Sequence, residues 1–131
     1  MGVIVVAEDH EDIRYVLTRS LERAGHQVVA AADGAAALAA VREHVPDLVI
    51  TDVDMPHMTG LDLCRAIRSD QELQHIPVVL ASGSMLPGDS RATEAGASAL
   101  LLKPFVPGQL VELVSNLLTA WPAAGRPPAA G

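Results

Sequence analysis

The 131-residue sequence has few aromatic residues, a single cysteine and fewer basic than acidic residues. Aromatic residues make up 2% of it, so a core has to be built from Val, Leu, Ile and Ala. Because Cys64 is the only cysteine, neither an intrachain disulfide nor a cysteine-based zinc site can form, which fits a reducing, cytoplasmic setting. The net charge of −7 argues against binding to nucleic acid or to an anionic membrane, since both require a basic surface.

The sequence also has no long hydrophobic run. Its first apolar residues are interrupted by Glu8 and Asp9, without the basic segment or cleavage site of a signal peptide. No stretch is long enough to span a bilayer as a helix. Half of the residues are nevertheless hydrophobic, and the length is close to the commonest size of one domain. We therefore expect a single domain with an aliphatic core.

Short apolar, β-branched runs alternate with helical patterns along the chain. The runs expected to be strands are residues 3–6, 27–30, 48–50, 78–81 and 100–102. The expected helices are residues 13–24, 33–44, a third that follows Gly60, a short fourth over about 89–95, and 110–121. Apolar strands joined by helices form parallel sheets covered on both faces, so we expect an α/β fold with a doubly wound sheet. Residues 122–131 are Ala, Pro and Gly with one Arg, which predicts a disordered tail or linker stub after a domain of residues 1–121.

Polar residues stand at the carboxyl ends of these expected strands, where sites form in parallel sheets. Glu8 and Asp9 follow the first strand, and Asp52 follows the third. Ser82 follows the fourth strand and Lys103 the fifth. Three carboxylates, one hydroxyl and one ammonium group would therefore meet at one edge of the sheet. Because crowded carboxylates repel one another, either one of them stays protonated or a cation offsets their charge.

The chemistry of this residue set suits phosphoryl transfer. Oxygen ligands with room for water are typical of Mg²⁺, and an ion held by Asp9 and Asp52 would also accept phosphate oxygens. Lys103 could pair with a carboxylate at rest and with a phosphoryl oxygen later, and Ser82 could donate a hydrogen bond to the same group. Asp52 would then be the attacking carboxylate, while the metal ion and Lys103 neutralise charge.

Four segments resemble, in order, the motifs of two-component receiver domains. They are residues 5–14 (VVAEDHEDIR), 46–60 (PDLVITDVDMPHMTG), 77–83 (PVVLASG), and 95–97 (AGA) with 102–105 (LKPF). The resemblance covers about residues 1–120 and is to the chemotaxis-type single-domain receivers. It implies a flavodoxin-like sheet with strand order 2-1-3-4-5 and five helices, in a cytoplasmic protein of a bacterial signalling system.

The resemblance also implies a role for each site residue. Asp52 would accept a phosphoryl group from a histidine kinase or a histidine phosphotransfer protein. Ser82 would be the switch hydroxyl, Lys103 would bind the phosphate, and the bond before Pro104 is often cis in this family. The metal ion, Mg²⁺ or Mn²⁺, would be held by Glu8, Asp9, Asp52 and the backbone carbonyl of Asp54.

Three features depart from the family pattern. Glu8 stands where Asp is commoner, which adds one methylene to the metal site. Leu100 stands where the family usually has Tyr or Phe as the rotating switch residue. The loop after Ser82, with Pro87 and Gly88, is slightly short, so the fourth helix is expected to be truncated or displaced.

The first functional hypothesis is a phosphorylation-dependent switch that is not an enzyme beyond taking up and losing its own phosphoryl group. A downstream protein would bind the face of the fourth helix, fifth strand and fifth helix, with no direct contact to nucleic acid or membrane, and the chain would be a monomer or weak homodimer. Leu100 and the short fourth helix leave a second reading, a pseudo-receiver that binds partners without switching. A third is a haloacid-dehalogenase-like phosphatase, suggested by Asp52-Val53-Asp54 but opposed by Pro56 and the lack of room for a cap domain.

Overall fold

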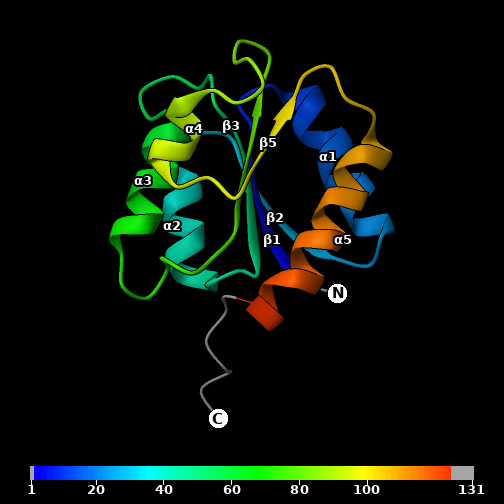
Figure 1. The fold of residues 1–131 in the computed structure, drawn as a ribbon. Coiled ribbons are helices and arrows are strands. Elements are labelled where there is room, and N and C mark those ends of the chain that lie inside the picture. The colour runs from blue at the N-terminus through cyan, green and yellow to red at the C-terminus, as the bar shows by residue number, and fades with distance from the viewer. Residues whose placement is uncertain (1, 125–131) are drawn as a thin grey trace.

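The computed structural model describes residues 2–124, of which 120–124 are described by their backbone alone, and it contains one five-stranded parallel sheet (Figure 1). The strand order is β2-β1-β3-β4-β5, which confirms the predicted topology. Each expected strand is present and is longer by one residue, or by two in the third strand, because adjoining residues also join the ladder. The strands are β1 (Val3–Ala7), β2 (Gln27–Ala31), β3 (Leu48–Asp52), β4 (Val78–Ser82) and β5 (Ala99–Leu102).

Five helices connect and cover these strands, as predicted. They are α1 (Glu11–Arg23), α2 (Gly34–His44), α3 (Gly60–Ser69), α4 (Ser90–Ala95) and α5 (Pro107–Ala124). Side chains accept hydrogen bonds from N–H groups at the start of α2, α3 and α4. Asp33 accepts a hydrogen bond from the Ala36 N–H at 2.7 Å, and Thr59 and Asp62 form a reciprocal capping box at the start of α3.

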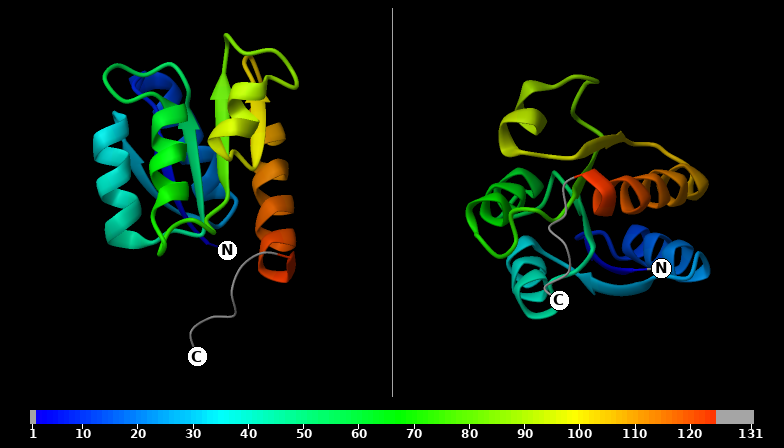
Figure 2. Two further views of the ribbon diagram at one scale, coloured as in Figure 1. Left: turned by 60° about the vertical axis from the view of Figure 1, so that its left-hand side comes forward. Right: turned by 60° about the horizontal axis from the view of Figure 1, so that its bottom comes forward.

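The helices form two layers, with α1 and α5 on one face of the sheet and α2, α3 and α4 on the other (Figures 1 and 2). Alternate strand residues supply the two cores. Val5, Val49 and Leu80 belong to the core under α2, α3 and α4. Ile4 and Ile50 belong to the core under α1 and α5. The residues of β5, at the edge of the sheet, are only half-buried, whereas β3 and β4 are buried throughout.

The predictions for the fourth and the last helix have different outcomes. The fourth helix has six residues, as the short loop indicated. The last helix, however, continues to Ala124 and includes Pro122, so the predicted domain boundary at residue 121 falls inside α5. Ala123 and Ala124 are strong helix formers, which favours this extension over the break that a proline alone predicts. The rest of the expected tail, residues 125–131, and the side chain of Trp121 lie outside the part that the structure describes.

Candidate functional site

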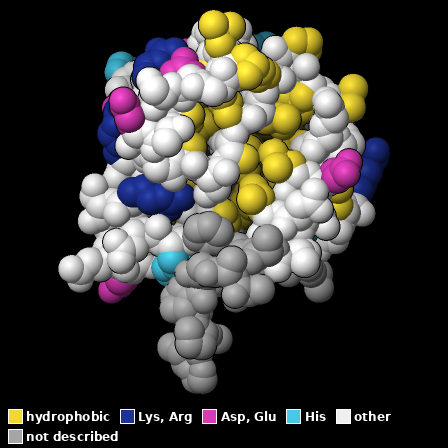
Figure 3. Space-filling model, viewed as in Figure 1, with side chains coloured by type: hydrophobic (Ala, Val, Ile, Leu, Met, Phe, Trp, Pro, Cys, Tyr) yellow, Lys and Arg dark blue, Asp and Glu magenta, His cyan; other side chains and the backbone are white. Residues whose placement is uncertain are grey.

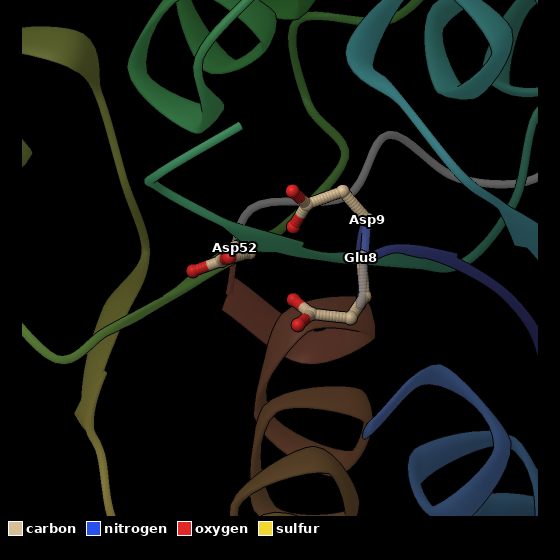
Figure 4. Close-up of side chains that lie close together, drawn as sticks. All are labelled: Glu8, Asp9 and Asp52. Carbon is tan, nitrogen blue, oxygen red and sulfur yellow. The ribbon is translucent and has the colours of Figure 1, made fainter. Parts of the chain in front are cut away.

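Three carboxylates meet at the carboxyl edge of the sheet. Ala7 of β1 is paired with Thr51 of β3, so the residues that follow them, Glu8 and Asp52, lie next to each other. Together with Asp9 they offer ligand oxygens that all lie within 4.8 Å of one another. Figure 4 shows the carboxylates of Glu8 and Asp9 directed to the side on which Asp52 lies. Glu8 is 2% exposed and Asp52 6%, whereas Asp9 is exposed, so the cluster is open to solvent at Asp9.

Hydrogen bonds to its backbone hold Glu8 at this edge. The Glu8 N–H donates to the Ala31 carbonyl at 3.1 Å, which continues the pairing of β1 with β2 by one residue. The guanidinium of Arg14, near the start of α1, donates to the Glu8 carbonyl at 2.8 Å. The chain therefore stays extended through Glu8 before it turns into α1.

The backbone of Asp52 packs against the start of α3. The Gly60 N–H donates to the Val53 carbonyl at 3.0 Å. A methyl group at Gly60 would overlap the Asp52 carbonyl oxygen. On the side of β4, the Val53 N–H donates to the Ala81 carbonyl at 3.0 Å. Residue 60 therefore has to be a glycine for the loop to return this closely to the end of β3.

Lys103, the only lysine of the sequence, is the cation of the cluster. Its Nζ lies 3.2 Å from Asp52 Oδ1 and 3.6 Å from Glu8 Oε1. The Lys103 N–H donates to the Ser82 carbonyl at 2.8 Å, which ties the end of β5 to the end of β4. The Lys103–Pro104 peptide bond is cis, as the family pattern indicated. One ammonium group beside three carboxylates leaves the site with an excess of negative charge.

Glu8 takes up part of this excess by protonation. Burial raises the pKa of Glu8 from 4.5 to about 7, and the carboxylates of Asp52 and Asp9 add to the rise while Lys103 opposes it. Near neutral pH the Glu8 carboxyl is therefore partly protonated. The sequence left open whether a proton or a cation offsets the negative charge of the three carboxylates. When no cation is bound, a proton on Glu8 offsets part of this charge.

Ser82 lies at the same edge, but its hydroxyl is turned to its own loop. Asp52 pairs with Ala81 in the neighbouring strand, so Ser82 stands one residue beyond it, fully buried. Its Oγ accepts hydrogen bonds from the N–H groups of Ser84 and Met85, both at 3.0 Å, and lies 3.2 Å from the Ser84 Oγ. The strand position is thus as predicted, while the hydroxyl is bound by the loop that follows β4.

The side chain of Asp54 lies outside the acidic cluster. It is exposed, and its Oδ2 accepts a hydrogen bond from the Ser84 hydroxyl at 3.1 Å. Only its backbone carbonyl is then a candidate metal ligand, as the sequence indicated. The outward carboxylate also does not favour the phosphatase reading, in which this second aspartate acts as a general acid. Sequence reasoning did not predict the contacts of Ser84 with Asp54 and Ser82.

The donor set fits a hard divalent cation. All three side chains supply carboxylate oxygens, which Mg²⁺ prefers to nitrogen or sulfur ligands. Two of them are buried, and the raised pKa of Glu8 shows that the site gains from added positive charge. The exposed Asp9 leaves room for the water molecules that Mg²⁺ keeps when it is bound by protein.

The sheet order, together with an acidic cluster beside a lysine at its carboxyl edge, defines an α/β signalling receiver. Residues 4–115 match the model of the response regulator receiver domain, and the chain belongs to this family. It is thus the receiver domain of a two-component response regulator, a class of modules that generally signal and are not enzymes. No helix in residues 2–124 has the length and apolar character needed to cross a bilayer.

Bacterial relatives and solved structures agree with this assignment. Over 117 residues the chain is 41% identical to the sensory/regulatory protein RpfC of Xanthomonas campestris pv. campestris. The aligned region covers 87% of the chain but only 16% of RpfC. It is 29% identical to the polar-differentiation response regulator DivK of Brucella ovis, over 88% of the chain and 94% of DivK. The chemotaxis response regulator CheY4 of Vibrio cholerae superposes with a TM-score of 0.84 at 30% identity, over 89% of the chain and 98% of CheY4.

Proposed function

We propose that Asp52 accepts a phosphoryl group from a histidine kinase or a histidine phosphotransfer protein, and that the modification changes a protein-binding face. The observation that carries this proposal is the setting of the Asp52 carboxylate. It is buried, it lies 3.2 Å from Lys103 Nζ, and it is part of a cluster of three carboxylates. A carboxylate held between a cation and candidate metal ligands is poised to bond with phosphorus.

The residues of the cluster divide the work. Glu8, Asp9, Asp52 and the Asp54 carbonyl would hold Mg²⁺ or Mn²⁺, and the ion would neutralise charge on the phosphoryl oxygens. An Asp52 oxygen forms the new bond to phosphorus while the P–N bond of the donor phosphohistidine breaks. The Lys103 ammonium group, already beside Asp52, stabilises the charge that arrives on the phosphoryl oxygens.

A groove next to the cluster is suited to the phosphoryl donor. Its volume is about 510 Å³, and Lys103 stands in its wall. Most of the other lining residues are apolar and come from α1 and the start of the chain after β5: Ile13, Val16, Leu17, Pro104, Phe105 and Pro107. A donor that packs an apolar helix face here brings its phosphohistidine close to Asp52. This placement supports a protein donor in place of a free small molecule as the physiological source.

The face of α4, β5 and α5 is the candidate surface for the downstream partner. Figure 3 shows hydrophobic side chains gathered on the front of the molecule, where β5 lies between α4 and α5. Leu86 is 74% exposed in the loop before α4, and Val106 is 61% exposed just before α5. Leu100 packs partly against the core and lines a cavity of about 170 Å³ beside α4. The exposed apolar area supports docking of a protein, or a weak homodimer.

Incubation with acetyl phosphate and Mg²⁺, followed by intact mass measurement, tests the proposal. We expect one added phosphoryl group on the wild-type chain, none after removal of the metal with a chelator, and none on Asp52→Asn. The Asp70→Asn variant, which changes a half-buried aspartate at the end of α3, away from the cluster, is the matched control and keeps the adduct. An unmodified wild-type chain, or an adduct that persists on Asp52→Asn, contradicts the proposal.

The pseudo-receiver reading keeps one observation in its favour, because Leu100 is smaller than an aromatic residue and leaves the cavity beside α4 open. Amide hydrogen exchange of the phosphorylated chain separates the two readings. A switch changes the exchange of α4 and β5 amides. An adduct that leaves them unchanged identifies a module that is phosphorylated without switching.

A further inference from the structure

A chain of hydrogen bonds joins the loop after β3 to the buried hydroxyl at the end of β4. The Ser84 hydroxyl donates to Asp54 Oδ2 at 3.1 Å, and Oδ1 lies 3.4 Å away. The Ser84 Oγ is also 3.2 Å from the Ser82 Oγ. Asp54 and Ser84 are exposed, whereas Ser82 is fully buried, so the chain runs from the surface to the interior.

The direction of the protons along this chain follows from the chemistry of its ends. A hydroxyl has one proton to donate, and that of Ser84 is directed to the Asp54 carboxylate. In the contact between the two serines the proton must therefore come from Ser82. The order of donation is Ser82 to Ser84 to Asp54.

This order uses every hydrogen-bonding position of the Ser82 hydroxyl. Its proton goes to the Ser84 Oγ, and its two lone pairs accept the N–H groups of Ser84 and Met85 at 3.0 Å. A phosphoryl group on Asp52 offers only oxygen acceptors, so the Ser82 proton can reach it only by leaving Ser84. Breaking a satisfied, buried set of hydrogen bonds has a cost that the phosphoryl group has to exceed.

We propose that Asp54 and Ser84 form a lock that holds the Ser82 hydroxyl in the unphosphorylated state and so sets the free energy needed to switch the domain. The inference rests on the proposed function of Asp52 and Ser82, and adds two positioning residues that act through Ser82. The lock joins segments 30 residues apart, one adjoining the phosphoacceptor and the other leading to α4. Its state therefore couples the acidic cluster to the partner-binding face without an aromatic side chain at position 100.

The first test needs neither metal nor phosphate. Amide exchange at Met85, whose N–H is accepted by Ser82, is measured by NMR on the unliganded chain for wild type, Ser84→Ala and Ser84→Thr. Loss of one neutral hydrogen bond corresponds to roughly threefold to tenfold faster exchange at Met85 in Ser84→Ala. Ser84→Thr keeps the hydroxyl and restores the wild-type rate. The matched control is Asp89→Asn, which removes a carboxylate from the same loop while asparagine can still cap α4.

The second test measures the affinity for beryllofluoride, a phosphoryl mimic, in the presence of Mg²⁺. Removing a contact that exists only in the unliganded state tightens binding, so we expect Ser84→Ala to bind roughly threefold to tenfold more tightly than wild type. A side chain that merely supports the loop gives the opposite sign or no change. If the Ser82 hydroxyl is already removed by Ser82→Ala, adding Ser84→Ala should no longer tighten beryllofluoride binding. The Asp54→Asn variant also removes a negative charge near the site, so any tightening that it causes in the Ser82→Ala background measures the effect of that charge alone.

Unchanged Met85 exchange, unchanged or weaker beryllofluoride binding by Ser84→Ala, or a gain that persists in the Ser82→Ala background each overturns the lock. Failure of the proposed function has a different signature, because the wild-type chain then does not bind beryllofluoride at all. The exchange measurement still decides the lock in that case.

Discussion

Glu8 couples the acidic cluster to pH, since it combines nearly complete burial with two neighbouring carboxylates. In the folded chain its pKa is about 7, compared with 4.5 for an ordinary glutamate. Between these values the folded state holds a proton that the unfolded state has released. The folded protein therefore loses stability as the pH rises through this range. A bound divalent cation removes the effect, because it favours the ionised form of Glu8.

We expect the free energy of unfolding of the metal-free chain to fall by on the order of 2 kcal/mol between about pH 5 and pH 7.5 through Glu8 alone. Urea unfolding at a series of pH values measures it. Burial lowers the pKa of His26, so the contribution of His26 to the free energy of unfolding rises with pH. The contribution of Glu8 is therefore obtained by subtracting the pH dependence of the Glu8→Gln variant from that of the wild type. The same slope in wild type and Glu8→Gln, or a slope that survives saturating Mg²⁺, counts against this account.

At the scale of single elements, the start of α3 is placed by a contact that leaves no room for a side chain. We expect Gly60→Ala to lower the free energy of unfolding by about 1–3 kcal/mol, because the added methyl group overlaps the Asp52 carbonyl oxygen and Val53. The shifted Asp52 backbone should also slow phosphorylation. Gly108→Ala, in the first turn of α5, is the control, since its methyl group meets nothing within 4 Å and should be neutral or stabilising. Equal effects of the two substitutions in urea unfolding would refute the steric argument.

The guanidinium of Arg68 holds the C-terminal end of α4 against α3. It donates to the carbonyls of Gly96 at 2.8 Å, Ile76 at 2.6 Å and Gln74 at 3.0 Å, and to the Ser98 hydroxyl at 3.3 Å. Burial lowers the pKa of Arg68, which agrees with a cation whose hydrogen bonds in the described chain go to neutral oxygens. The C-terminal end of α4 is thus held by hydrogen bonds, while its N-terminal end is connected to the loop that contains Ser84.

We expect Arg68→Ala to destabilise the fold by about 2–4 kcal/mol, because it leaves several partly buried carbonyls without a donor. Arg68→Lys should recover only part of this, since an ammonium group cannot reach the same set of oxygens. Arg65→Ala, three residues earlier on the same helix, removes an exposed pair with Asp62 at 3.5 Å and should change stability by less than about 0.5 kcal/mol. Thermal and urea unfolding compare the three variants. A loss at Arg65 as large as that at Arg68 would contradict the clamp.

The sequence predicts the strand ends well, because each site residue follows an apolar run and parallel strands share one carboxyl edge. Glu8, Asp9, Asp52 and Lys103 could therefore be placed together without coordinates. The direction of the Ser82 hydroxyl could not, since it depends on where two N–H groups point in a loop without periodic pattern. The Arg68 clamp was equally hidden, because its partner Gly96 lies 28 residues away and no spacing rule links them. Local patterns predict elements, and tertiary contacts decide the orientation of polar side chains.

At the scale of the whole molecule, the strands of the sheet differ in how deeply they are buried. The central strands β1, β3 and β4 are almost entirely buried, whereas β5 is an edge strand that is half-buried along its length. The short α4 packs chiefly against α3 and leaves the front of β5 uncovered (Figure 3). The proposed switch surface therefore includes an edge strand that is less buried than the central strands.

Native-state amide hydrogen exchange should reveal this gradient. We expect the amides of β1, β3 and β4 to exchange only through global unfolding, and those of α4 and β5 to exchange through smaller openings, since local stability follows burial and packing. Mg²⁺ with beryllofluoride should slow exchange in the loop between β4 and α4 more than in α2, because the ligand engages Ser82 and leaves the far helix untouched. The reference for slow exchange in a helix near the cluster is α1, which buries Leu17 and Leu21. If α4 exchanged as slowly as β3, the partner-binding face would be as rigid as the core, and a switch at this face would need global unfolding to move.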